Sequence, residues 1–212
     1  MRNKKLFVGI CNSQSQVPSR FFWSIIAMRK PIKSVFARAV HPWDVIRNNE
    51  LIDWFLKSDC DYFVKMDVDQ VYPDNYLEKM LPLVEKYKVI GPLIFDRWPD
   101  GNFMPLVNFR GVASGVNKQF DVRGKSGIIE VPYYHTNCFF HRDALEAVPQ
   151  PHYEAYAEPD GLKRSNHVDA SFMEKFPKAG FKIYANLDVC VKHIAEIEVD
   201  REVHERWKRG SV

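Results

Sequence analysis

A short apolar segment that ends in two aspartates constrains this 212-residue chain more than any other stretch. Tyr62–Met66 is rich in β-formers, with Lys65 as its single charged residue, and this pattern predicts a buried strand. Asp67 and Asp69 follow, and alternate residues of an extended segment project to the same side. Two neighbouring carboxylates repel unless a cation or protons neutralise them, and hard divalent ions favour oxygen ligands. The segment therefore predicts a metal site at a strand end, with a turn of solvated acids as the alternative.

Composition favours one α/β domain. Hydrophobic residues make up 46% of the chain, which is enough for a core and argues against disorder. The net charge of +3 is too small to indicate a nucleic-acid-binding protein by itself. The four cysteines form no C-x-x-C pair, so we expect buried thiols in a reducing compartment. No apolar run suits a signal peptide or a membrane span, so we expect a cytoplasmic protein without a membrane span.

Strand and helix patterns alternate before residue 70. Leu6–Cys11 predicts a buried strand, a helix should begin near Arg20, and Lys33–Val40 predicts a second strand. Another helix follows Pro42, with Asp44 as its expected N-cap. This order suits ligand binding at the carboxyl end of the first strand. A G-x-G-x-x-G motif and a Walker lysine are absent, so we expect neither a dinucleotide site nor a P-loop.

The middle of the chain predicts further strands. Val89–Phe95 and Ile128–Tyr134 are strand candidates, and residues 96–126 predict a variable loop or a small hairpin. A helical pattern lies between Asp69 and Val89. Asp74 should cap this helix, and Pro82 should kink or split it.

The last third predicts a helix, a strand and a charged tail. Val168–Phe176 has a helical apolar face, Gly180 should end that helix, and a strand should end near His193. Residues 196–212 predict an amphipathic helix or tail that packs on the domain, contacts a partner or meets a polyanionic acceptor.

These motifs, in this order, resemble those of GT-A-fold glycosyltransferases, especially small viral and bacterial members similar to glycosyltransferase family 2. The strand closed by Asp67-Val68-Asp69 resembles the D-x-D motif, and Arg47-Asn48 precedes it as in the family. Ala179–Ile183 and the later His193 resemble the segment that ends in the family's third metal ligand. The resemblance implies the nucleotide-diphospho-sugar transferase-like GT-A fold, with a mixed, mainly parallel sheet flanked by helices. It implies a catalytic domain over residues 1–195 and a tail over 196–212.

The resemblance also implies a function. We expect a metal-dependent glycosyltransferase that moves a sugar from a nucleoside-diphosphate sugar to an acceptor hydroxyl on a glycan, a protein or a modified nucleic-acid base. Mn²⁺ or Mg²⁺ would be held by Asp67, Asp69 and His193. The residues expected to contact the donor are Asn12, Ser13, Gln14, Arg47 and Asp67.

The catalytic base is the point at which the chain departs from the family. The usual Glu-Asp pair is replaced by Asn166-His167. A histidine, with a pKa of about 6.5, is competent as a base. Asp169 is expected in the first turn of a helix, where exposed N–H groups favour an anion. We favour Asp169 as the base, with His167 orienting acceptor or phosphate. The reverse assignment and a catalytically idle site remain open.

Two other functions remain alternatives. Asp67–Val71 fits the D-x-D-x-T/V motif of haloacid dehalogenase-type phosphatases, although that family carries the motif on its first strand and adds a late acidic pair. The Asn166-His167 departure suggests a non-enzymatic module that binds a sugar nucleotide or a glycan. Hydrolysis of a simple phosphomonoester would favour the phosphatase, and donor binding without turnover would favour the module.

Overall fold

The computed structural model describes residues 4–13, 16–95, 107–110, 117–119, 122, 124–134, 137–155 and 168–194, with residues 107–110 and 117–119 described by backbone alone. Its principal strands are β1 (Lys5–Cys11), β2 (Lys33–Ala39), β3 (Tyr62–Asp67), β4 (Gln70–Val71), β5 (Val89–Ile94), β8 (Ile128–Val131), β10 (Phe139–His141) and β11 (Ile183–His193). Its helices are α1 (Ser19–Ala27), α2 (Asp44–Lys57), α3 (Tyr76–Tyr87), α4 (Arg142–Ala147), α5 (Val168–Met173) and α6 (Lys175–Lys178).

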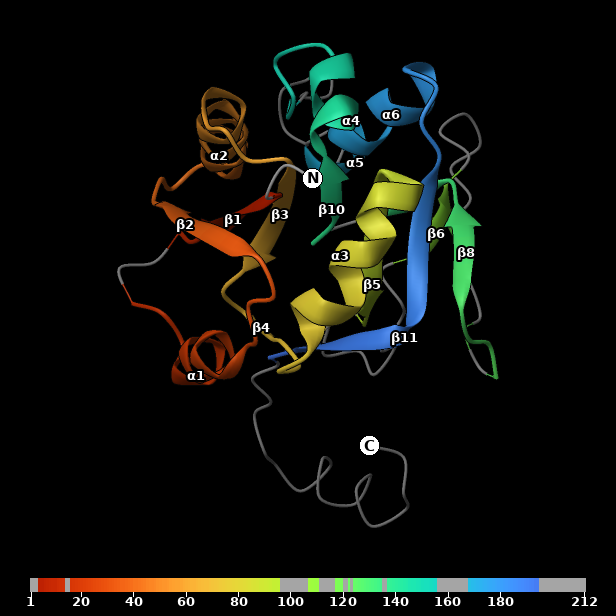
Figure 1. The fold of residues 1–212 in the computed structure, drawn as a ribbon. Helices are drawn as coiled ribbons and strands as arrows, with labels where there is room; N and C mark the ends of the chain where they lie inside the picture. The colour runs from red at the N-terminus through yellow and green to blue at the C-terminus, as the bar shows by residue number, and fades with distance from the viewer. Residues whose placement is uncertain are drawn as a thin grey trace, which may run out of the picture.

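One mixed sheet runs through the centre of the molecule (Figure 1). Its order is β2-β1-β3-β10-β5-β11-β4, and β8 pairs with the first part of β11. Strand β1 is parallel to β2 and β3, and β5 is parallel to β11, whereas β10 runs antiparallel between β3 and β5. The expected mixed sheet flanked by helices is therefore confirmed.

Side-chain alternation divides the core into two layers. On β3, Tyr62, Val64 and Met66 pack with residues of α1 and α3, while Phe63 packs with residues of α2, α5 and α6 on the other face. Lys65 and Asp67 share the face of Phe63 by the same alternation. The strand that carries the aspartates is thus an inner strand covered on both faces.

The glycine-rich middle segment contains a small second sheet. β6 (Val107–Arg110) pairs antiparallel with β7 (Asn117–Gln119) and with β9 (Tyr133–Tyr134). The expected hairpin is therefore present. The single strand expected over Ile128–Tyr134 is wrong, because Pro132 separates β8 in the large sheet from β9 in the small one.

Three helix details also differ from expectation. Helix α3 continues through Pro82 without a split, and the burial of its apolar face offsets the hydrogen bond that the proline cannot donate. The N-cap positions of α2 and α3 are Trp43 and Asn75 rather than Asp44 and Asp74. The helix expected over Val168–Phe176 is interrupted, so α5 and α6 are separate.

Gly180 behaves as expected after α6. Its φ of +86° is the left-handed conformation in which glycine carries no steric penalty, and the chain turns there into β11. Among the helices in the described ranges, none is both long and apolar enough to cross a bilayer.

Close packing at Gly91 gives a test of the sheet. A β-carbon there would lie 2.4 Å from Cζ of Tyr134, whose buried hydroxyl donates a hydrogen bond to the carbonyl of Pro92. Because the ring is held, Gly91→Ala should lower the free energy of unfolding by about 1–3 kcal/mol, the usual cost of overpacking. Urea denaturation measures this change. The control Val40→Ala alters an exposed side chain and should have little effect. An unchanged midpoint for Gly91→Ala would contradict this packing.

Candidate functional site

The candidate site lies where β1 and β3 end together. Cys11, the last residue of β1, pairs in parallel register with Asp67, the last residue of β3. The chain leaves β1 to form β2 on one side and then returns to form β3 on the other side. Ligands of open α/β sheets bind outside the carboxyl ends of strands at such a change of direction. Asn12 and Ser13 follow β1 at this edge.

A second strand pairing brings Asp69 and His193 together from distant parts of the chain. Strand β4 pairs antiparallel with the end of β11, which places Gln70 opposite His193. The N–H of Ile194 donates a hydrogen bond of 2.7 Å to the carbonyl of Asp69. As a result, Asp69 Oδ2 lies 3.5 Å from His193 Nε2. Two of the three ligands expected from the sequence are therefore neighbours.

The hydrogen bonding of His193 indicates what its other nitrogen faces. Nδ1 lies 3.0 Å from the carbonyl oxygen of Phe95, and a carbonyl can only accept, so Nδ1 carries the proton. In the neutral ring, Nε2 then presents a lone pair toward the Asp69 carboxylate. Two acceptors at this distance require a cation or a second proton between them. Metal-binding histidines commonly donate their other N–H to a carbonyl in this way.

The spacing of these two donors suits a divalent ion. Two ligands of one ion with bonds of about 2.1 Å lie roughly 3–3.5 Å apart. Asp69 and His193 fit that requirement: Asp69 supplies the carboxylate oxygen that Mn²⁺ and Mg²⁺ favour, and His193 supplies an imidazole, which suits Mn²⁺ better than the harder Mg²⁺. Within the described ranges, no cluster of three histidine, cysteine or acidic side chains could hold a metal. The site is thus a two-residue candidate as far as the described residues extend.

Asp67 does not join that pair. β3 ends at Asp67 and the chain turns at Val68 and Asp69, so the extended geometry expected for the two aspartates is not adopted. Oδ1 of Asp67 instead lies 3.5 Å from the ammonium of Lys65. The same ammonium lies 3.3 Å from Oδ1 of Asp169 on α5.

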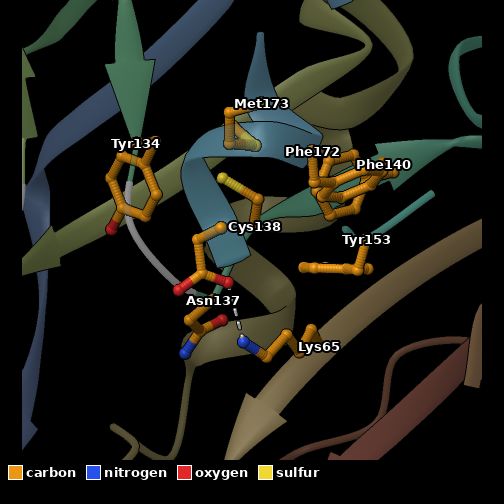
Figure 2. Close-up of a pocket in the computed structure, with 9 residues that line it drawn as sticks. Lys65, Tyr134, Asn137, Cys138, Phe140, Tyr153, Phe172 and Met173 are labelled. Atoms are coloured by element: carbon orange, nitrogen blue, oxygen red, sulfur yellow. Dashed lines mark hydrogen bonds and ion pairs between the residues drawn. The ribbon is translucent and has the colours of Figure 1, made fainter. Parts of the chain in front are cut away.

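Lys65 is the site residue to which the sequence analysis gave no role. Figure 2 shows it reaching from β3 into a pocket between Asn137 and Tyr153, beneath Cys138. Burial lowers the pKa of Lys65, but the carboxylates of Asp169 and Asp67 outweigh it and hold the pKa well above its ordinary 10.5. Lys65 is therefore a buried cation at neutral pH. Strand alternation puts it on the same face as Asp67, and that signal was available in the sequence.

The pocket around Lys65 is otherwise mostly apolar. The residues that line it with Lys65 are Tyr134, Asn137, Cys138, Phe140, Tyr153, Asp169, Phe172 and Met173. Burial raises the pKa of both the Cys138 thiol and the Tyr153 phenol, so both groups stay protonated. The charged groups among these lining residues are thus the paired Lys65 and Asp169.

A buried hydrogen-bond network holds the turn that carries Asp69. The Asn137 amide donates to Gln70 Oε1 at 2.9 Å and to the Tyr72 hydroxyl at 3.0 Å, and it accepts from the Tyr76 hydroxyl at 2.8 Å. Tyr72 also donates to Gln70 at 2.7 Å. Asn137 adopts a positive φ of 21°, a backbone conformation that asparagine tolerates better than most residues.

The remaining site candidates have mixed positions. Asn12 is buried and its amide donates to the carbonyl of Gln16 at 3.4 Å, whereas Ser13 is exposed. Arg47 is buried rather than solvent-facing: its guanidinium donates to the carbonyls of residues 41 and 42 and to Cys11 Sγ at 3.3 Å. Arg47 therefore fastens the start of α2 to the end of β1. The expected roles of Gln14, His167 and the tail over 196–212 lie outside the described residues.

Comparison with known proteins identifies a fold and no family. The sequence matches no protein-family model and no curated protein. Among solved structures, the crystal structure of A197 from STIV is similar, with a TM-score of 0.60 and 17% sequence identity. The match covers 91% of this chain and 86% of that one. At this identity the likeness shows a shared fold alone.

Removing the buried cation tests the ion-pair arrangement. Lys65→Met leaves Asp67 and Asp169 close together without their shared counter-ion, and we expect the free energy of unfolding to fall by about 2–4 kcal/mol at neutral pH. The measurement is chemical denaturation. The matched control is Lys57→Met, which removes an exposed pair with Asp53 and should change stability little.

The pH dependence of that difference has a defined sign. Because the pKa of Lys65 is raised in the folded state, its stabilisation is complete below 10.5, the ordinary value, and is lost as the pH rises through the raised value. The stability gap between wild type and Lys65→Met should therefore stay constant from neutral pH to about pH 9.5 and close at higher pH. A gap that is absent at neutral pH would contradict the buried ion pair.

Proposed function

We propose that this chain is a metal-dependent glycosyltransferase of GT-A type that moves a sugar from a nucleoside-diphosphate sugar to an acceptor hydroxyl. The observation that carries the proposal is the approach of Asp69 to His193 beside the shared carboxyl ends of β1 and β3. The sequence pattern predicts these two residues as ligands of one ion, although they lie far apart in the chain. The mixed sheet and its inner aspartate-bearing strand agree with that fold.

Asp69 and His193 would hold Mn²⁺ or Mg²⁺. When bound, such an ion neutralises a diphosphate and supplies Lewis-acid stabilisation of the departing nucleoside diphosphate. Asn12 and Ser13 lie at the adjacent strand end, where a loop after the first strand suits a base and ribose. Arg47 keeps this loop region in place through its hydrogen bond to Cys11 and thus acts on the donor indirectly.

Asp169 is the proposed base. Its carboxylate is fixed by Lys65 at 3.3 Å in a pocket beside β3, and Lys65 also fixes Asp67 at the strand end. In the proposed reaction Asp169 accepts the proton of the acceptor hydroxyl, whose oxygen attacks the anomeric carbon as the nucleoside diphosphate departs. A positioned base of this kind contributes about 10²–10⁴ in rate. The acceptor is a glycan, a protein or a modified nucleic-acid base in this proposal.

The metal proposal predicts a loss of binding when either ligand is changed. Asp69→Asn and His193→Gln should each weaken Mn²⁺-dependent binding of a nucleoside diphosphate by at least about tenfold, because each removes an inner ligand. Isothermal titration with Mn²⁺ and a panel of nucleoside diphosphates measures this. Metal affinity should also weaken as the pH is lowered and the imidazole becomes protonated, since a protonated imidazole cannot bind a metal.

Asp74→Asn is the matched control, because Asp74 is exposed and follows the same turn. Its affinity for Mn²⁺ should equal that of the wild type. Unchanged affinity in both ligand variants would rule out the metal site at Asp69 and His193.

The base proposal predicts a kinetic effect. Asp169→Asn should lower kcat by about 10² or more with little change in donor affinity. The assay is release of nucleoside diphosphate from a panel of sugar nucleotides, with water or an added glycan as acceptor. Asp53→Asn, on the exposed side of α2, is the control. Equal turnover in Asp169→Asn and wild type would show that Asp169 is not the base.

The same assays separate the alternatives. Hydrolysis of p-nitrophenyl phosphate without use of any sugar nucleotide would favour the phosphatase. Metal-dependent binding of a sugar nucleotide with no release of nucleoside diphosphate would favour the binding module.

A further inference from the structure

Helix α1 presents an apolar face to solvent. Its inner side buries Phe21, Ser24 and the following Met28. On the outer side Trp23 is 64% exposed, Ile26 59% and Phe22 49%. Large apolar side chains gathered on one outward helical face mark an interaction surface more often than scattered single ones do.

The helix is firmly attached, so this exposure does not come from a loose segment. The ring of Phe21 packs edge-on against Tyr72, with centroids 6.0 Å apart. After the helix, the N–H of Arg29 donates to the carbonyl of Asp74 at 2.8 Å, and its guanidinium lies 3.0 Å from Glu78. These contacts fix α1 to the turn region after β4 and to the start of α3.

Exposed basic side chains outnumber acidic ones on and beside this face. Arg20 lies at the edge of the exposed face of α1, and Lys30 follows the helix; both are exposed. The Lys30 ammonium lies 5.8 Å from the ring centre of Phe36 on β2, which extends the apolar and basic surface onto the edge strand. Asp74 and Glu78 are the acidic groups nearby, and both face Arg29.

We propose that the α1 face, defined as Arg20, Phe22, Trp23, Ile26 and Lys30, docks on an anionic lipid bilayer. Tryptophan and other apolar side chains on a helix flanked by basic residues are typical of helices that lie in the interface plane of a membrane. The exposed Arg20 and Lys30 at the edges of this face are attracted to anionic headgroups. The contact is peripheral and makes no use of a spanning helix.

Docking in this way brings the candidate site close to the lipid surface. Helix α1 contacts β4, which directly follows the turn that carries Asp69. The loop that contains Asn12 and Ser13 leads into α1. The inference stands on surface residues alone and does not depend on the proposed transfer reaction.

Vesicle co-sedimentation of the full chain tests this docking. We expect binding to vesicles of phosphatidylcholine with phosphatidylglycerol, weaker binding to phosphatidylcholine alone, and weakening with salt. The double variant Trp23→Ser with Ile26→Ser should bind anionic vesicles at least about tenfold more weakly, because both side chains lose their burial in the interface. Its thermal melting should match that of the wild type.

The control is Trp43→Ser, which removes a tryptophan that is 69% exposed at the start of α2, on the other face of the sheet. Its vesicle binding should equal that of the wild type. Absence of binding by the wild type would overturn the proposal. Full binding by the double variant would also overturn it, because the contact would then lie elsewhere. A wild-type dimer in solution that the double variant disrupts, with no vesicle binding by either protein, would overturn it as well.

Discussion

The antiparallel pairing of β4 with the end of β11 is the contact on which the candidate site depends. Without that two-residue strand, the turn that carries Asp69 would not be held beside the end of β11 that carries His193. A buried hydrogen-bond network of Asn137, Gln70 and Tyr72 stabilises this pairing, because each of these polar side chains finds hydrogen-bond partners among the others. Burial raises the pKa of Tyr72 well above its ordinary value, so its hydroxyl remains a donor. The turn is thus fixed by neutral hydrogen bonds rather than by charge.

The charged groups divide into two sets with different cations. Asp67 and Asp169 share the ammonium of Lys65, a cation built into the strand. Asp69 faces a histidine whose orientation is set by the carbonyl of Phe95, an arrangement that suits an exchangeable ion. This division gives a physical reason why Asp67 can be structural while Asp69 serves as the proposed metal ligand. It also keeps the proposed base and the proposed metal pair electrostatically distinct.

Local patterns were sufficient for most of the fold. The strands β1, β3 and β5 follow from the local pattern because each is an almost wholly buried apolar run, whereas β2 was also predicted although most of its residues are exposed. Caps and breaks were less predictable: Pro132 divides two strands, whereas Pro82 leaves α3 intact, and the difference lies in tertiary packing that a local pattern does not contain. For the site, the sequence paired Asp69 with His193 through resemblance. It missed Lys65: the neighbouring Asp67 on the same face was a local signal, but the second carboxylate that makes the burial possible, Asp169, comes from α5, a hundred residues later.

The most direct test of the metal site is pulsed electron paramagnetic resonance of Mn²⁺ added to the protein. If His193 is a ligand, the spectrum should contain electron spin-echo modulation from a directly bound imidazole nitrogen. The modulation should persist in His41→Gln, which changes a histidine on the β2–α2 connection, and should vanish in His193→Gln. A Mn²⁺ spectrum with no nitrogen modulation in the wild type, or with the same modulation in His193→Gln, would contradict the site on which the proposed function depends.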